Sequence, residues 1–102
     1  MRLLHTKDLT LKTFYSDIPG YAILSHTWVE GEEVSFKELC KRRDQMKSGW
    51  NKIRKFCALV AGKGFEWCWI DTCCIDKSSS DELQEGINSM YTYYRNCRIC
   101  IV

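Results

Sequence analysis

The stretch Trp67-Cys68-Trp69-Ile70-Asp71-Thr72-Cys73-Cys74-Ile75-Asp76-Lys77-Ser78-Ser79-Ser80 decides how this chain folds. Its apolar, aromatic run stops at Asp71 and gives way to Asp, Thr, Cys, Lys and Ser, and a helical pattern follows directly. This order is typical of a buried strand that passes through a polar loop into the start of a helix. In open α/β sheets, ligands bind at this end of the strands. The stretch therefore predicts an α/β fold with a candidate site beside Asp71.

An earlier segment shows the same order of residue types. The apolar run 21–24 is followed by Ser25, His26, Thr27 and Trp28. If the two runs form neighbouring parallel strands, their carboxyl ends meet at one edge of the sheet. We then expect a crevice there that gathers His26, Asp71, Cys73, Cys74 and Asp76.

The other segments supply the helices and the remaining strands. A weak alternation over residues 2–5 and 9–14 predicts an N-terminal hairpin, and residues 21–24, 65–70 and 98–102 predict core strands. Ser35 and Glu38 form a capping box for a short helix that reaches about Gln45. A second helix runs from residue 48 to the glycines at 62–64. Ser79 and Glu82 form another capping box, and the helix behind it has apolar residues at helical spacing.

These elements follow the order β-α-α-β-α-β after the hairpin. Apolar strands separated by helices imply a small, mostly parallel sheet with both faces covered. Three core strands bury little surface, and no helix follows the last of them. Either the last strand is an edge of the sheet, or residues 1–102 are the N-terminal and central part of a larger single domain. We expect the second.

Composition limits the classes of protein that this chain can belong to. The 102 residues include 45% hydrophobic residues and seven cysteines, an odd number in a chain with no secretory signal. This usage predicts free thiols in a reducing compartment. No apolar run is long enough to span a membrane. Cys97 and Cys100 lie within a predicted strand and face opposite sides of it, so we expect no metal site.

The charge is distributed unevenly along the chain. Residues 37–55 hold eight Lys or Arg and two Asp or Glu, which gives this segment a net charge of +6. Since the whole chain has a net charge of +2, the remaining residues have a net charge of −4. A basic patch can attract phosphate or acidic partners. It is more often a solvated helix face, and the segment has no nucleic-acid-binding motif, so we expect no DNA partner.

Three residues are the candidates for catalysis: His26, Asp71 and Glu82. A His at a strand end can act as a general base or a ligand, or can simply bind a neighbouring strand end. Asp71 can orient His26 or hold a ligand, or can cap the loop. Glu82 is either a catalytic carboxylate or the capping partner of Ser79. One of the adjacent Cys73 and Cys74 could serve as a nucleophile if His26 lowered its pKa, although buried structural cysteines are far more common.

The wall of the expected crevice comes from the same two loops. Trp28 follows the polar cluster and is the tryptophan best placed to touch a ligand or partner. The serines before the third helix could bind phosphate through its free N–H groups, or simply cap it. The expected lining residues are Ser25, Thr27, Trp28, Asp76, Lys77 and Ser78.

Three blocks of the sequence together resemble the fungal heterokaryon-incompatibility (HET) domain. They are Tyr21-Ala22-Ile23-Leu24-Ser25-His26-Thr27-Trp28, then Trp69-Ile70-Asp71-Thr72-Cys73-Cys74-Ile75-Asp76-Lys77, then Glu82-Leu83 followed by Ile87-Asn88-Ser89-Met90 and Tyr93-Tyr94. The resemblance covers nearly the whole chain. It departs from the family pattern where Val29 and Glu30 stand before Gly31, since the family has Gly directly after the first block. The family domain also continues beyond the end of this chain.

The resemblance implies a fungal cytoplasmic protein that acts as a module of non-self recognition, in which fusion of incompatible strains triggers programmed cell death. Such a module is expected to work through self-association or recruitment of protein partners. The family is also similar, distantly, to TIR domains, which have a flavodoxin-like fold and some of which cleave NAD with a Glu near a helix start. Glu82-Leu83 after the serines matches that feature. The rival reading is therefore an NAD or nucleotide hydrolase, with NAD as substrate and not as a resident cofactor.

Overall fold

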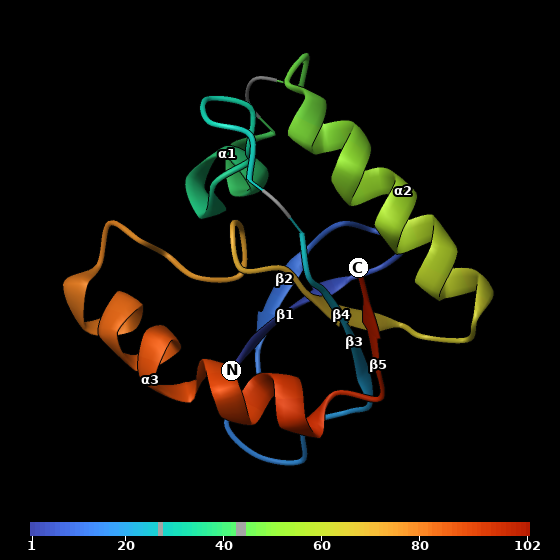
Figure 1. The fold of residues 1–102 in the computed structure, drawn as a ribbon, viewed down its shortest axis with the longest axis vertical. Coiled ribbons are helices and arrows are strands. Elements are labelled where there is room, and N and C mark those ends of the chain that lie inside the picture. Colours follow the sequence, from blue (N-terminus) through green and yellow to red (C-terminus); the bar gives the residue numbers. More distant parts are fainter. Residues whose placement is uncertain (27, 43–44) are drawn as a thin grey trace.

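The computed structural model describes residues 1–26, 28–42 and 45–102 (Figure 1). The predicted α/β fold with an N-terminal hairpin is confirmed for this part of the chain. Its strands and helices are, in order, β1 (Arg2–His5), β2 (Leu11–Thr13), β3 (Tyr21–Leu24), α1 (Phe36–Lys41), α2 (Ser48–Gly62), β4 (Trp67–Trp69), α3 (Ser80–Asn96) and β5 (Ile99–Ile101).

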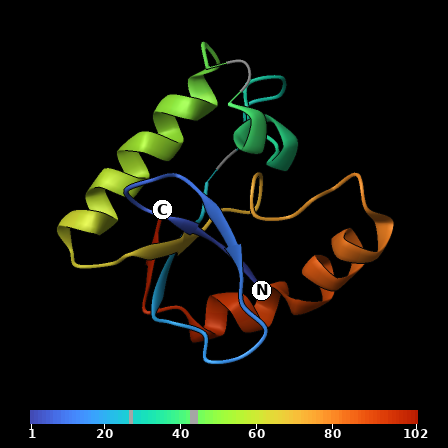
Figure 2. The ribbon, with the colours of Figure 1, turned by 180° about the vertical axis from the view of Figure 1, so that it is seen from behind.

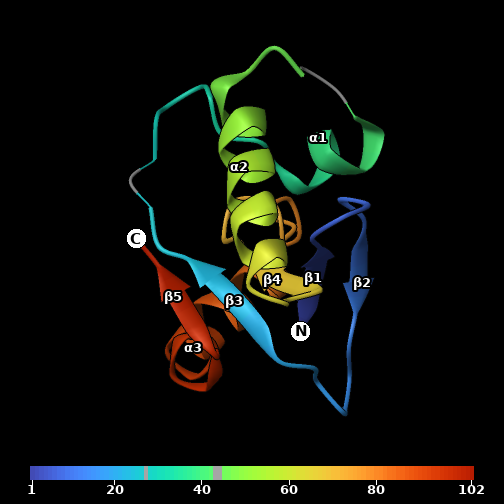
Figure 3. The same ribbon diagram turned by 90° about the vertical axis from the view of Figure 1, so that its right-hand side faces the viewer.

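The strands form one sheet in the order β2-β1-β4-β3-β5, which Figure 3 shows from right to left. β3 pairs in parallel with both β4 and β5, whereas β1 pairs antiparallel with both β2 and β4. The expectation of a mostly parallel sheet is therefore wrong, because the hairpin adds to the sheet and makes it mixed. The physical reason lies in Leu3 and Leu4, which are adjacent, point to opposite faces and are both fully buried. A strand with two apolar faces is stable only where both faces are covered.

Helices cover both faces of the sheet. Cys68 faces α2, where its Sγ lies 3.8 Å from the Sγ of Cys57, and the next residue, Trp69, faces α3, where its ring packs against Tyr93 and Tyr94. In Figure 3, α2 crosses in front of the sheet and α3 lies behind it. This arrangement follows from topology. From β3 the chain moves through α2 to β4 on one side and then through α3 to β5 on the other, and right-handed crossovers in opposite directions place their helices on opposite faces.

The helices differ in how much of their surface they bury. α2 packs Trp50, Ile53, Phe56 and Val60 into the core, as its apolar stripe predicts. α3 buries only Gly86 fully, where an added Cβ would lie 2.7 Å from Cδ1 of Ile75. The apolar stripe of α3 is therefore only partly covered.

The ends of the helices show how well the capping signals predict boundaries. The capping box of Ser35 and Glu38 is present in α1 with both of its hydrogen bonds. However, α1 ends at Lys41 and not near Gln45, because Arg42 takes a left-handed conformation (φ 54°) and closes the helix. Strand β4 is also shorter than the predicted residues 65–70.

Candidate functional site at the carboxyl ends of the parallel strands

The ends of β3 and β4 bring His26 and Asp71 together. The parallel register pairs Ile23 with Trp69, so residues just beyond the two strands lie at nearly the same height. Nε2 of His26 lies 2.9 Å from Oδ1 of Asp71, and both side chains are largely buried, with exposed fractions of 8% and 19%. The expectation that these two residues meet at one edge of the sheet is confirmed.

Trp28 and Lys77 extend this contact towards the surface. The indole Nε1 of Trp28 donates to Oδ2 of Asp71 at 3.2 Å, so the carboxylate accepts from both His26 and Trp28. The ammonium of Lys77 lies 4.7 Å from the centre of the Trp28 ring and donates to the backbone oxygen of Asp71 at 2.5 Å. Trp28 is nevertheless 49% exposed, so one side of the ring faces solvent.

Two residues that the sequence did not point to complete the network on its inner side. Nζ of Lys52, from α2, lies 3.0 Å from Nδ1 of His26 and 2.7 Å from Oε2 of Glu33. The same oxygen of Glu33 accepts from the backbone N–H of Val29 at 2.7 Å. A signal for Lys52 does exist in the sequence. A helix that follows a parallel strand begins at the carboxyl end of that strand, so its first turns lie beside the candidate site.

This geometry fixes the proton arrangement on His26. A lysine ammonium has only donors, so Nδ1 of His26 accepts from Lys52, and Nε2 carries the proton that it donates to Asp71. The order of groups is therefore Glu33, Lys52, His26 and Asp71, each bonded to the next. Both ring nitrogens of His26 are occupied within the protein, which suits a positioning role better than proton transfer to a ligand.

Burial and hydrogen bonds compete at the two charged ends of the network. At Glu33, burial opposes ionisation, but the hydrogen bonds from Lys52 and the Val29 N–H outweigh it and lower the pKa of Glu33 below its usual value. At Lys77, burial lowers the pKa of the ammonium, and the nearby charge of Asp71 opposes that shift. The network thus holds Glu33 in its ionised form.

Glu82 belongs to a different cluster. Its Oε1 forms an ion pair with Arg2 of β1 and accepts from the backbone N–H of Asp76 at 3.1 Å. Ser79 caps α3 by accepting from the Glu82 N–H at 3.4 Å, but the Glu82 carboxylate does not return the bond, so the predicted capping box is only half formed. The structure therefore brings two of the three catalytic candidates together and places the third on the β1 side of β4.

The remaining expected lining residues divide between these clusters. Oδ1 of Asp76 accepts from the N–H and the hydroxyl of Ser78 at 3.1 and 2.6 Å, and these hydrogen bonds lower the pKa of Asp76. Ser25 lies beside β5, where its N–H donates to the oxygen of Ile101 at 2.8 Å. Thr27 lies outside the described residues. Asp76, Lys77 and Ser78 together line a small hollow beside Ser35, Phe36 and Thr72, and His26 is not among its lining residues.

Neither Cys73 nor Cys74 is placed to act as a nucleophile. Their exposed fractions are 0% and 2%, so neither thiol is accessible to a substrate in solution. The hydrogen bond with Cys74 and burial raise the pKa of the Cys73 thiol well above its usual value. Sγ of Cys74 accepts from the backbone N–H of Ile70 at 3.4 Å. Both thiols serve as core packing beneath the loop.

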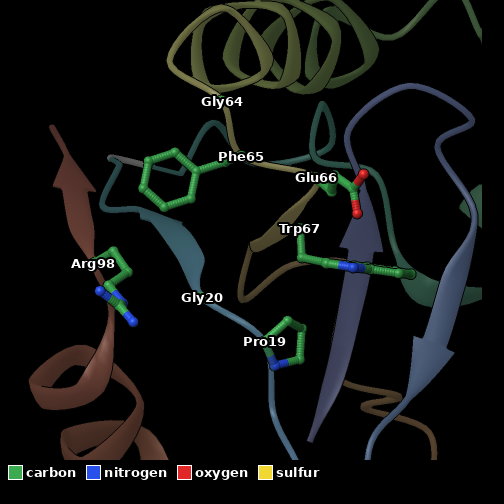
Figure 4. Close-up of a pocket in the computed structure, with 7 residues that line it drawn as sticks. All are labelled: Pro19, Gly20, Gly64, Phe65, Glu66, Trp67 and Arg98. Carbon is green, nitrogen blue, oxygen red and sulfur yellow. The ribbon is translucent and has the colours of Figure 1, made fainter.

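A separate hollow lies at the opposite, amino ends of the parallel strands. It encloses about 540 Å³ and is lined by Pro19, Gly20, Gly64, Phe65, Glu66, Trp67 and Arg98 (Figure 4). In Figure 4, Arg98 lies on one side of the hollow, and Trp67 and Glu66 lie on the other. It is open to solvent and far along the strands from the His26–Asp71 contact, so it forms no part of the candidate site.

Residues 1–26, 28–42 and 45–102 contain no group of three or more His, Cys, Asp or Glu side chains arranged to hold a metal ion. Among the helices of the same residues, none is long and apolar enough to cross a membrane.

Comparison with known proteins gives one family and one relative. Residues 21–102 match the family model described as "Heterokaryon incompatibility protein (HET)". Over 99 residues, the chain is 54% identical to "Vegetative incompatibility protein HET-E-1" of Podospora anserina. That alignment covers 95% of this chain and 7% of the relative, so the chain spans only a small part of that protein's length. No solved structure matches the chain.

Proposed function

The chain belongs to the heterokaryon incompatibility (HET) family, and on this basis we propose that it acts in fungal non-self recognition. In this proposal, the chain is one cytoplasmic domain, the front and central part of a longer one. It promotes programmed cell death when incompatible strains fuse. It does so by associating with itself or by recruiting a protein partner.

The identity of 54% over 95% of the chain to a vegetative incompatibility protein carries the proposal. The family match begins at Tyr21, the first residue of β3, and continues through β5. It therefore includes both of the strands that bring His26 and Asp71 together.

The candidate site supports recognition of a partner. His26 has both ring nitrogens occupied by Lys52 and Asp71, and the Asp71 carboxylate in turn fixes the Trp28 indole. Trp28 and the next residue, Val29, are 49% and 52% exposed. A rigidly held, half-exposed tryptophan beside another exposed apolar residue is typical of a contact surface for a protein. In this proposal the His26–Asp71 network positions Trp28.

Inducible expression in a fungal host tests the proposal. We expect growth to stop when the wild-type chain is induced, and to continue with Trp28→Ala at equal protein level. The matched control is Leu59→Ala, which removes an apolar side chain of similar exposure (47%) from the outer side of α2. If wild type and Trp28→Ala both leave growth unchanged while folded protein accumulates, the proposal is wrong.

The alternative function is hydrolysis of NAD or another nucleotide at the strand ends. One observation favours it. The parallel strands have the order β4-β3-β5, in which the first strand lies between the second and the third, as at the start of flavodoxin-like sheets. In such sheets, ligands bind just beyond the carboxyl ends of the strands, at the point where the strand order reverses. His26 lies at this point, just beyond the end of β3.

Glu82 separates the two functions. In the enzymatic reading, Glu82→Gln stops NAD consumption, because the amide cannot act as a base or nucleophile. The control is Arg2→Gln, which removes the same ion pair but keeps the carboxylate. NAD consumption that is lost in Glu82→Gln and kept in Arg2→Gln supports catalysis. Unchanged NAD in cells that stop growing supports assembly.

A further inference from the structure

Residues at the end of α1, before the start of α2 and within α2 form a surface that we call the basic knob. It is defined by Lys41, Arg42, Met46, Lys47 and Arg54. Met46 is 98% exposed, so its apolar side chain has almost no cover. The guanidinium groups of Arg42 and Arg54 lie 6.0 and 5.2 Å from the centre of the Trp50 ring, which fixes them beside the start of α2. Arg54 also donates to Gln45, the residue next to Met46, at 3.2 Å. Lys47 forms an ion pair with Glu38 at 2.8 Å, and Arg42 also donates to the backbone oxygen of Asp8 at 2.9 Å. The knob is therefore an apolar tip beside the charged groups of Arg42 and Arg54.

An acidic hollow lies on the other side of the molecule, between α3 and the β1–β2 hairpin, which is nearest the viewer in Figure 2. It encloses about 550 Å³, and its lining includes the aromatic side chains of Phe14, Tyr15, Trp69 and Tyr93 and the aliphatic side chains of Ile18 and Ile75. This volume is within the usual range of about 300–1,000 Å³ for ligand sites. The hollow is therefore large enough to admit an apolar side chain.

The charge around this hollow comes from the first two turns of α3. Asp81, Glu82 and Glu85 line it, together with Arg2 and the N-terminal amine of Met1. Arg2 pairs with Glu82, and the amine donates to the backbone oxygen of Phe14 at 2.9 Å. Within the described residues, Asp81 and Glu85 form no ion pair, and both are exposed. They lie four residues apart on α3, so they project from the same side of the helix.

The two surfaces carry opposite charges, and one presents an apolar side chain where the other has a hollow. We propose that a second copy of this chain inserts Met46 into the acidic hollow, with Arg42 and Arg54 of its basic knob against Asp81 and Glu85. This inference rests on the self-association form of the proposed function and assigns the surfaces that make it. The net charge of +6 over residues 37–55 against −4 for the rest of the chain favours such contacts over like-to-like ones.

The position of the two surfaces determines the kind of assembly. The start of α2 lies at the top of Figure 1 and α3 at the bottom, on opposite sides of the sheet. A contact between two different surfaces is heterologous, and after each addition one knob and one hollow stay free. The chain therefore assembles head to tail into oligomers that grow with concentration, and does not stop at a symmetric dimer.

Sedimentation velocity of the purified chain tests the proposal, with two variants that each remove one surface. Met46→Ser removes the apolar tip, and Asp81→Lys combined with Glu85→Lys reverses the charge of the hollow. Lys7→Glu and Glu66→Lys are the matched controls, because both positions are exposed and lie outside the two surfaces. Thermal melts establish that every variant is folded.

We expect the wild type and both controls to sediment faster as concentration rises. Raising the salt concentration from about 0.1 to about 1 M should weaken this association, because the Debye length falls from about 10 to about 3 Å. Each surface variant alone should associate at least about tenfold more weakly. An equimolar mixture of the two should form a dimer and nothing larger, since one supplies the knob and the other the hollow.

Three results would overturn the proposal: a wild type that stays monomeric, surface variants that assemble like the wild type, or a mixture that stays monomeric while the wild type assembles. A monomeric wild type that still stops fungal growth removes this inference but leaves the proposed function, acting through another protein. Binding of a synthetic basic peptide to the hollow of a monomeric wild type would identify another protein as the occupant, and would also contradict the proposal.

Discussion

Replacing Asp71 tests whether the His26 network holds the site together. Its carboxylate accepts hydrogen bonds from His26 at 2.9 Å and from Trp28 at 3.2 Å. Asp71→Ala removes both acceptors, whereas Asp71→Asn keeps one neutral acceptor of nearly the same shape. The two variants therefore separate the loss of charge from the loss of the hydrogen bonds.

The magnitude follows from the burial of the two donors. Trp28 is 49% exposed, so water replaces the carboxylate at its N–H and little free energy is lost. The His26 side chain is only 8% exposed, so its N–H stays buried without an acceptor, which costs about 1–3 kcal/mol. With the lost charge-assisted bond, Asp71→Ala should lower the free energy of unfolding by about 2–4 kcal/mol, and Asp71→Asn by about 1 kcal/mol.

Urea unfolding and thermal melts measure this difference. For a domain of this size, each kcal/mol shifts Tm by about 4–8 °C. The control is Glu66→Ala, which removes an exposed carboxylate just before β4 and should change the free energy of unfolding by less than about 0.5 kcal/mol. The reasoning is refuted if Asp71→Ala is no less stable than Glu66→Ala.

Three further predictions concern stability. A Cβ at Gly49 would lie 2.3 Å from the backbone oxygen of Glu32, so Gly49→Ala should lower the free energy of unfolding in urea by about 1–3 kcal/mol. Gly62 has open space around it, so Gly62→Ala should raise the free energy of unfolding by up to about 1 kcal/mol. Equal effects of the two substitutions would contradict this reasoning. The folded-state pKa of Glu33 is lowered, so its contribution to stability is present above the ordinary pKa of 4.5 and is lost as pH falls through the folded value. In thermal melts across this pH range, the stability of Glu33→Gln should fall less steeply with decreasing pH than that of the wild type. The same pH dependence in both proteins would argue against the Glu33 contacts. Burial raises the pKa of Tyr21 to about 12, so its contribution is present below pH 10.0 and is lost as pH rises through about 12, and alkaline melts of Tyr21→Phe should lack this loss.

The sequence predicted the local features of the fold well, because they depend on neighbouring residues. The two strand ends, the capping box at Ser35 and the start of α3 at its Ser79 cap all rest on patterns within a few residues. The pairing of the hairpin with β4 was not predicted, because Leu4 and Cys68 are far apart in sequence and the alternation in β1 is weak. Local patterns contain no information on which strand a hairpin joins.

The same distinction applies to the site. The meeting of His26 with Asp71 followed from parallel pairing of two similar segments. Lys52 was not predicted, because it is 26 residues from His26 in the sequence. The helical pattern around it identifies the apolar residues that face the core and says nothing about its polar residues. Glu82 had two predicted roles, as a catalytic carboxylate or as the capping partner of Ser79, and its pairing with Arg2 was not among them. Arg2 is 80 residues away in the sequence, and an ion pair between such distant residues leaves no local signal.

The most direct test of the account is fungal growth after induction of the wild-type chain and of the Asp81→Lys, Glu85→Lys variant, with cellular NAD measured in parallel. We predict that the wild type stops growth before NAD changes, and that the variant, at equal level and equally folded, allows growth. Loss of NAD before growth stops, or equal toxicity of the two proteins, would contradict a cell-death module that acts by head-to-tail assembly.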